Sequence, residues 1–265
     1  MDELYTLIEQ AILEKNPQRK CDLARSLDCA WREGRLEQRP DLPILSIDDP
    51  GRPERPKLVH PRQLSGSSTT TEAGRIVLIH ALAHIEFNAI NIALDAAYRF
   101  RNMPRQYVSD WLKVACEEAM HFGLFARELE LRGSCYGALD AHAGLWDMVC
   151  KTRHDHLHRM ALVPRVMEAR GLDVTPSMIR RFEQSGDQAA VEILQIIYQD
   201  EITHVRIGNQ WYQYLCAQRG IDAQAMFREL VSMYMGNGLR GPFNWPARMQ
   251  AGFSRTELEA LDGAG

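Results

Sequence analysis

The hydrophobic positions of this chain recur mainly at the three- and four-residue spacing of amphipathic helices. The long patterns of this kind cover residues 72–102, 104–133, 145–170 and 187–218. Shorter ones cover residues 2–40, 175–186 and 221–235. No stretch shows a convincing strand-like alternation of polar and apolar residues. The pattern therefore predicts an all-α protein.

Local signals place the ends of these helices. Thr71 and Glu72 form an expected N-cap, and Pro104 is suited to the first turn of the second long helix. Gly133 is expected to end that helix, and Gly171 the third. Thr175-Pro176 is expected to start a short helix.

Two segments differ in composition from the helical patterns. Residues 41–71 contain five of the twelve prolines and are predicted to be extended or looped. Residues 236–251, GNGLRGPFNWPARMQA, are rich in Gly and Pro and are predicted to be irregular, with Ser254 capping a last short helix.

Four long helices in two hairpins favour an antiparallel four-helix bundle over residues 72–218. Residues 1–71 and 219–265 would then pack on this bundle as appendages.

Charge and cysteine content exclude several classes of protein. The formal net charge is −4, from 31 basic and 35 acidic residues, which argues against a dedicated nucleic-acid-binding protein. We expect no membrane span, and the acidic start MDELYTLIEQ is unlike a secretory signal. The six cysteines contain no CxxC pair and are expected to be reduced thiols. These features favour a cytoplasmic globular protein.

Two Glu-x-x-His pairs interrupt the apolar faces of long helices. Glu118 and His121 lie within one apolar stripe, and Glu201 and His204 lie within another. Residues three apart on a helix point to the same side, so each pair can present two ligands together. A carboxylate in a dry core is costly unless a charge compensates it, and a metal cation would do so.

The spacing of two further acids strengthens this interpretation. Glu86 precedes Glu118 by 32 residues, and Glu168 precedes Glu201 by 33. The midpoint of the first interval is Asn102, where the helix is expected to break, so equal arms should place Glu86 and Glu118 at one height. For the second interval Asp155 is a rival to Glu168, but its separation from Glu201 is 46 residues.

Four Glu and two His from four helices form the di-iron or di-manganese carboxylate pattern of ferritin-like proteins. Hard carboxylate oxygens with one imidazole per metal suit two Fe ions, with Mn or a mixed Fe/Mn pair as alternatives. Two Fe(II) ions can together deliver electrons to O2, which would allow hydroxylation or oxidase chemistry. Pro164, four residues before Glu168, is expected to kink its helix beside the site.

Four motifs resemble an uncharacterised bacterial ferritin-like family, a domain of unknown function: HIEFNAINIALDAAYRF, EEAMHFGLFARELELRG, MALVPRVMEARGLDVTP and DEITHVRIGNQWY. The tail GPFNWPAR is similar to that family as well. By pattern, the nearest functional relatives resemble tRNA-modifying di-iron hydroxylases. The resemblance implies the metal ligands Glu86, Glu118, His121, Glu168, Glu201 and His204, but no substrate.

Other polar residues have plausible structural roles beside functional ones. Tyr198 precedes Glu201 by one turn and is a candidate for hydrogen bonding or redox activity at the site, or for core packing. His80 and His84 are expected to be core histidines or supports for the ligands, and Asp200 to orient a ligand histidine. The cluster His154, His156 and His158 is expected to be a solvated helix start, with a separate metal site as the alternative. The basic residues of the proline-rich segment are expected to lie in a wrapping loop, with phosphate contact as the alternative; they are Arg52, Arg55, Lys57 and Arg62.

The leading functional hypothesis is an oxygen-dependent hydroxylase or oxidase acting on a small organic substrate. Its partners would be O2 and an electron donor that the sequence does not identify. The alternatives are a tRNA-modifying hydroxylase, an iron-handling ferritin-type protein and a structural bundle with a relict site. The sequence leaves open whether the chain forms a homodimer.

Overall fold

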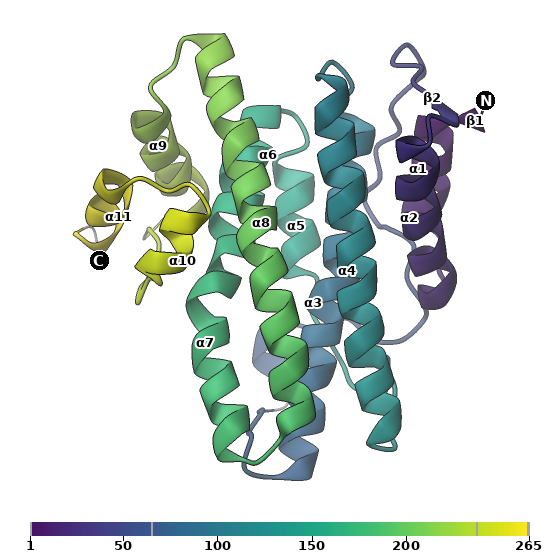
Figure 1. The fold of residues 1–265 in the computed structure, drawn as a ribbon, viewed down its shortest axis with the longest axis vertical. Coiled ribbons are helices and arrows are strands. Elements are labelled where there is room, and N and C mark those ends of the chain that lie inside the picture. The colour runs from purple at the N-terminus through teal and green to yellow at the C-terminus, as the bar shows by residue number, and fades with distance from the viewer. Residues whose placement is uncertain (1, 65, 237, 264–265) are drawn as a thin grey trace. The chain divides into compact units, whose positions relative to one another are not determined.

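The computed structural model describes residues 2–64, 66–236 and 238–263, and the chain divides into two compact units, residues 1–146 and 147–265. Both are helical, as the hydrophobic pattern predicts (Figure 1). The elements of unit 1 are β1 (Asp2–Glu3), α1 (Leu4–Leu13), α2 (Pro17–Arg32), β2 (Leu36–Glu37), η1 (Pro61–Gln63), α3 (Glu72–Arg99) and α4 (Arg105–Leu131). Helix α5 (Gly144–Lys151) spans the boundary between the units. The predicted division into 1–71, 72–218 and 219–265 stays a prediction.

Helices α3 and α4 form the centre of unit 1, with α2 packed on α4 and α1 packed on α3. Thr71 caps α3 as predicted, because its side-chain oxygen accepts a hydrogen bond from the Gly74 amide at 3.1 Å. Helix α3 ends at Arg99 and Pro104 is the N-cap residue of α4, so the chain turns back between these two residues. The strands β1 and β2 pair in parallel over only two residues each, too few for an alternating pattern to reveal them.

The proline-rich segment is almost entirely non-helical, as predicted, apart from the short 3-10 turn η1. It is held to unit 1 by backbone contacts: Val59 donates to the Ala141 carbonyl at 2.8 Å, and the Ala141 amide donates to Lys57 at 3.0 Å. The Trp146 indole donates to the Asp48 carbonyl at 3.0 Å. These bonds satisfy backbone groups that a loop rich in proline cannot pair within itself.

Helix α3 is long and apolar enough to cross a membrane by length and composition, with a mean hydropathy of 1.5 over its best window. One such helix is weak evidence for a membrane span, so the expectation of no span stays a prediction. However, 72% of that window is buried inside the protein, which is typical of the core helix of a soluble protein. Among the described residues α3 is the only helix that is long and apolar enough to cross a membrane.

The elements of unit 2 after α5 are α6 (His156–Leu162), the π-helix η2 (Val163–Glu168), α7 (Ala169–Gln184), α8 (Gln188–Arg219), α9 (Ala223–Met235), α10 (Trp245–Gln250) and α11 (Arg255–Asp262). Segments α6, η2 and α7 follow one another directly, and each packs against the long helix α8 (Figure 1). Ser254 caps α11 with a reciprocal capping box to Glu257, as predicted for its N-terminus.

Four predictions for unit 2 are wrong. The pattern over 145–170 is not one helix, because α5 ends at Lys151 and Asp155 caps a new helix, α6. Gly171 does not end a helix and Pro176 does not begin one, since both lie inside α7. The segment 236–251 is not wholly irregular: Asn244 caps the short helix α10, whose first turn tolerates Pro246.

Candidate metal site

Three candidate ligands meet in the interior of unit 1. Glu86 comes from α3, and Glu118 and His121 come from α4. Their exposed fractions are 5%, 1% and 0%, so all three are buried. Nδ1 of His121 lies 3.2 Å from Oε2 of Glu118 and 3.5 Å from Oε2 of Glu86. The helix turn between α3 and α4 thus brings Glu86 opposite the Glu-x-x-His pair, as the equal spacing predicts.

The electrostatics of this group are unfavourable without a cation. Burial raises the pKa of Glu86 well above its ordinary value, and the neighbouring Glu118 carboxylate adds to this effect, although the hydrogen bond from His121 opposes it. The ligand atoms of the three residues lie within 4.8 Å of one another. One imidazole and two carboxylates at this separation form a group that can hold a metal ion.

The second Glu-x-x-His pair lies on α8 in unit 2. Oε1 of Glu201 lies 3.4 Å from Nδ1 of His204, the His204 side chain is fully buried, and the Glu201 side chain is 13% exposed. Glu168, the remaining predicted ligand, is the last residue of the π-helix, which packs against α8. π-Helical turns are rare and often occur at functional sites.

A close backbone approach holds the π-helix against α8. Pro164 lies at the start of the π-helix, so the helix is irregular beside this proline, and the predicted kink itself stays a prediction. Gly208 lies one turn after His204 on α8, and a Cβ atom there would lie 2.1 Å from Cβ of Pro164. Only glycine therefore fits at position 208 without a shift of one of the two helices.

Two histidines near Glu86 have structural partners. Nε2 of His80 accepts a hydrogen bond from the Gly137 amide at 2.9 Å. Nε2 of His84 lies 3.1 Å from the His142 carbonyl oxygen. A carbonyl oxygen can only accept, so Nε2 carries the proton and donates it to this bond. Nδ1 of the neutral ring then accepts a hydrogen bond from the Tyr136 hydroxyl at 2.9 Å. Burial lowers the pKa of His84 to about 4, which keeps this histidine neutral. Both are core histidines, as expected.

Tyr136 is a residue of this region that the sequence did not indicate. Its ring contacts Phe122 with centroids 5.0 Å apart and Phe87 at 5.4 Å, and these two residues follow His121 and Glu86 in the chain. It therefore closes the apolar wall beside the site. Tyr136 lies in the loop after α4, where no helical periodicity points to burial.

The other candidates of unit 2 are placed as follows. Asp155 caps α6 and binds Arg219 through both carboxylate oxygens, at 2.8 and 3.0 Å, which explains it as a structural residue. Nδ1 of His158 lies 2.8 Å from the Tyr234 hydroxyl, and within the described ranges the His154–His158 cluster does not form a group of metal ligands. The Tyr198 hydroxyl accepts a hydrogen bond from Nδ2 of Asn244 at 2.7 Å, so it contacts the GPFNWPAR segment. A catalytic role for Tyr198 stays a prediction.

The fold and this site together define a helical protein with a buried carboxylate–imidazole group able to hold a metal. The chain belongs to the family described as "Protein of unknown function (DUF455)", which matches residues 13–259. It is 46% identical over 267 residues to an uncharacterized protein of Haemophilus influenzae (strain ATCC 51907 / DSM 11121 / KW20 / Rd), covering 97% of this chain and 93% of the relative. No solved structure matches.

Proposed function

We propose that this protein is a di-iron carboxylate oxidoreductase, a hydroxylase or oxidase that uses O2 on a small organic substrate. The observation that carries the proposal is the buried group Glu86, Glu118 and His121 with its raised Glu86 pKa. Two carboxylates enclosed this closely are stable as anions only when a cation neutralises them. Their hard oxygen atoms and single imidazole fit iron or manganese.

The proposal requires that the two Glu-x-x-His pairs serve one centre. Glu201 would then join the group of unit 1, and His204 and Glu168 would complete a second metal position. The helices α3, α4 and α8 and the segment from α6 to α7 would form the four walls of a ferritin-like bundle. Two Fe(II) ions held by these residues would supply the electrons for O2 chemistry.

The surrounding side chains have defined tasks in this function. Phe87, Phe122 and Tyr136 exclude water from the side of the site that lies in unit 1. Neutral His84 fixes the Tyr136 hydroxyl and so keeps this wall in place. A dry wall limits oxidation of the protein itself and directs reactivity to a bound substrate. All six cysteines are free thiols, which suits the proposed cytoplasmic location.

Metal loading of single-site variants tests this function. Anaerobic protein should bind two Fe(II) per chain and develop a ferric absorbance on exposure to air. Glu118→Ala should lower Fe(II) affinity more than roughly 100-fold, because loss of groups that merely support a ligand already costs 10- to 100-fold. Glu201→Ala should reduce the bound iron in the same way.

Glu117→Ala provides the matched control. Glu117 precedes Glu118 on the same helix and forms a surface ion pair with Lys113, so its loss should leave iron binding unchanged. Elemental analysis gives the stoichiometry and optical spectroscopy the oxidation. If Glu118→Ala binds iron like the wild type, or if the wild-type protein refuses Fe, Mn and Zn, the proposal is wrong.

A further inference from the structure

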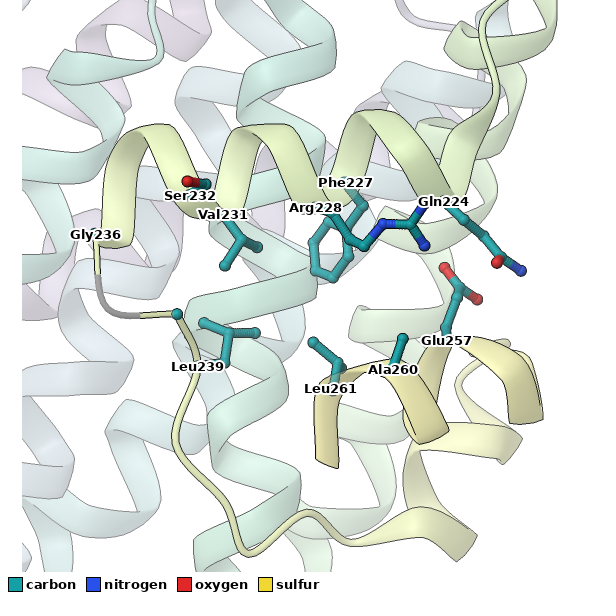
Figure 2. A pocket seen from close by; sticks show the side chains of 11 residues that line it. Gln224, Phe227, Arg228, Val231, Ser232, Gly236, Leu239, Glu257, Ala260 and Leu261 are labelled. Carbon is teal, nitrogen blue, oxygen red and sulfur yellow. The ribbon is translucent and has the colours of Figure 1, made fainter. Parts of the chain in front are cut away.

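Unit 2 contains a cavity that the metal site does not use. It lies between α9, α11, Gly238 and Leu239, and has a volume of about 400 Å³ (Figure 2). Cavities of 300–1,000 Å³ are typical of small-molecule sites. At roughly 30 Å³ per non-hydrogen atom, the space holds about a dozen such atoms.

The two ends of the cavity differ in chemistry. Phe227, Val231, Leu239 and Leu261 give most of the cavity an apolar lining. Figure 2 shows the side chains of Gln224, Arg228 and Glu257 at the opposite end from Val231 and Leu239. A ligand that matches both ends has an apolar body and one polar head.

The charges at the polar end select the sign of that head. Burial raises the pKa of Glu257, but the charge of Arg165 and the hydrogen bonds from Arg165 and Ser254 outweigh this effect and lower the pKa below its ordinary value. Glu257 is therefore ionised. Arg165, which is fully buried, is bound to Glu257 and cancels its charge. Arg228 is exposed, and within the described parts of the chain no carboxylate pairs with it. The polar end therefore has one positive charge in excess.

We propose that this cavity binds a medium-chain monocarboxylate, with its alkyl or aromatic body against Phe227 and Leu261 and its carboxylate on Arg228. The Gln224 amide provides a second hydrogen-bond donor beside the head group. A single negative charge balances the excess at this end, whereas a cationic head would face Arg228 directly. None of the lining residues is one of the six proposed metal ligands, so the proposal does not rest on the proposed metal centre.

Binding of octanoate to the full-length protein tests the proposal. Isothermal titration should show saturable binding of one octanoate per chain, tighter than that of the neutral 1-octanol and the cationic octyltrimethylammonium. Arg228→Met should weaken octanoate binding about tenfold, because it removes a hydrogen bond between charged groups, and should leave 1-octanol binding unchanged. Arg228→Lys should retain part of the affinity for octanoate.

Two further variants complete the experiment. Ala260→Phe places a ring in the cavity and should abolish binding of octanoate and 1-octanol alike. Arg255→Met removes the same charge from the start of α11, outside the cavity lining, and should bind octanoate like the wild type. Circular dichroism and thermal unfolding establish that each variant is folded. Absence of saturable octanoate binding, equal affinity for 1-octanol, tighter binding of the cation, or wild-type affinity in Arg228→Met would each overturn the proposal.

Discussion

In unit 1 the Glu-x-x-His pair lies on α4, and both α4 and its partner helix α3 are regular. In unit 2 the pair lies on α8, whose partner helix contains a π-helical turn. In unit 1, α3 presents Glu86 directly opposite His121. In unit 2, the partner helix of α8 passes through the π-helical turn Val163–Glu168, and the contact of Pro164 with Gly208 fixes its distance. Nearly identical spacing in the sequence is therefore built from two different backbones.

The two units also bury a cation in different ways. In unit 1, Lys20 donates to the carbonyls of Ala11 and Ile12 at 2.8 and 2.7 Å, and to Oδ1 of Asn91 at 2.7 Å. In unit 2, Arg165 binds the Glu257 carboxylate. Its guanidinium also lies 4.3 Å from the ring centres of Tyr212 and Phe227.

This difference has consequences for titration and stability. A lysine that is held by neutral oxygens can lose its charge when burial becomes costly, because its pKa is within reach of ordinary pH. An arginine keeps its charge at any such pH and needs a carboxylate or aromatic faces to remain inside. Removing each cation should therefore affect the protein differently.

The largest effect is expected for Arg165→Met. This change leaves Glu257 without its partner, and breaking a buried ion pair costs about 3–5 kcal/mol of unfolding free energy. Arg180→Met on the exposed face of α7 is the control and should change stability by less than about 0.5 kcal/mol. Urea unfolding measures both. The double variant Arg165→Met/Glu257→Leu should recover much of the loss, and equal stability of Arg165→Met and Arg180→Met would refute the assignment.

A smaller loss is expected for Gly208→Ala. The added Cβ would overlap Pro164 and push α8 away from the π-helix, at a cost of about 1–3 kcal/mol. Gly171→Ala is the matched control, because it lies in α7 with no atom close to the added methyl group and should stabilise by roughly 0.5–1 kcal/mol. Denaturant unfolding of the two variants should thus give changes of opposite sign. A Gly208→Ala protein as stable as the wild type would show that the close approach is unimportant.

The sequence predicts unit 1 better than unit 2, because the helices of unit 1 are set by residues close to them in the chain, whereas helix α7 of unit 2 depends on a residue far away in the chain. The predicted helices 72–102 and 104–133 correspond to Glu72–Arg99 and Arg105–Leu131, because Thr71 and Pro104 act on their own turns. The position of Glu86 opposite His121 follows from the lengths of two regular helices alone.

Helix α7 shows why the same reasoning fails in unit 2. Pro176 has no amide hydrogen, so it cannot bond the Leu172 carbonyl one turn earlier, and the local sequence predicts a break. In the structure Nδ2 of Asn244 donates to that carbonyl at 3.0 Å and the helix continues. The partner lies 72 residues away in the chain, beyond the range of any local pattern.

The candidate site repeats this contrast. Glu86, Glu118 and His121 were predictable because spacing and apolar periodicity agree on two regular helices. Glu168 was harder to place, since a π-helical turn changes the direction in which every later side chain points. Its role as a ligand with Glu201 and His204 stays a prediction.

The smallest effect expected is a pH dependence that belongs to unit 1. Burial lowers the pKa of Lys20 from 10.5 to about 7, although Glu14 opposes this shift. Between pH 7 and 10.5 the unfolded chain therefore binds more protons at this residue than the folded protein does, and the stability must rise with pH.

Relative to Lys20→Met, the wild-type unfolding free energy should increase by roughly 1 kcal/mol from pH 7 to pH 8. Urea unfolding from pH 6 to 9 measures this difference, with Lys15→Met, which is exposed, as the control. If the difference in unfolding free energy between the wild type and Lys20→Met stays constant over this range, the prediction is wrong. The Lys20 amine would then remain charged, stabilised by the carbonyls of Ala11 and Ile12.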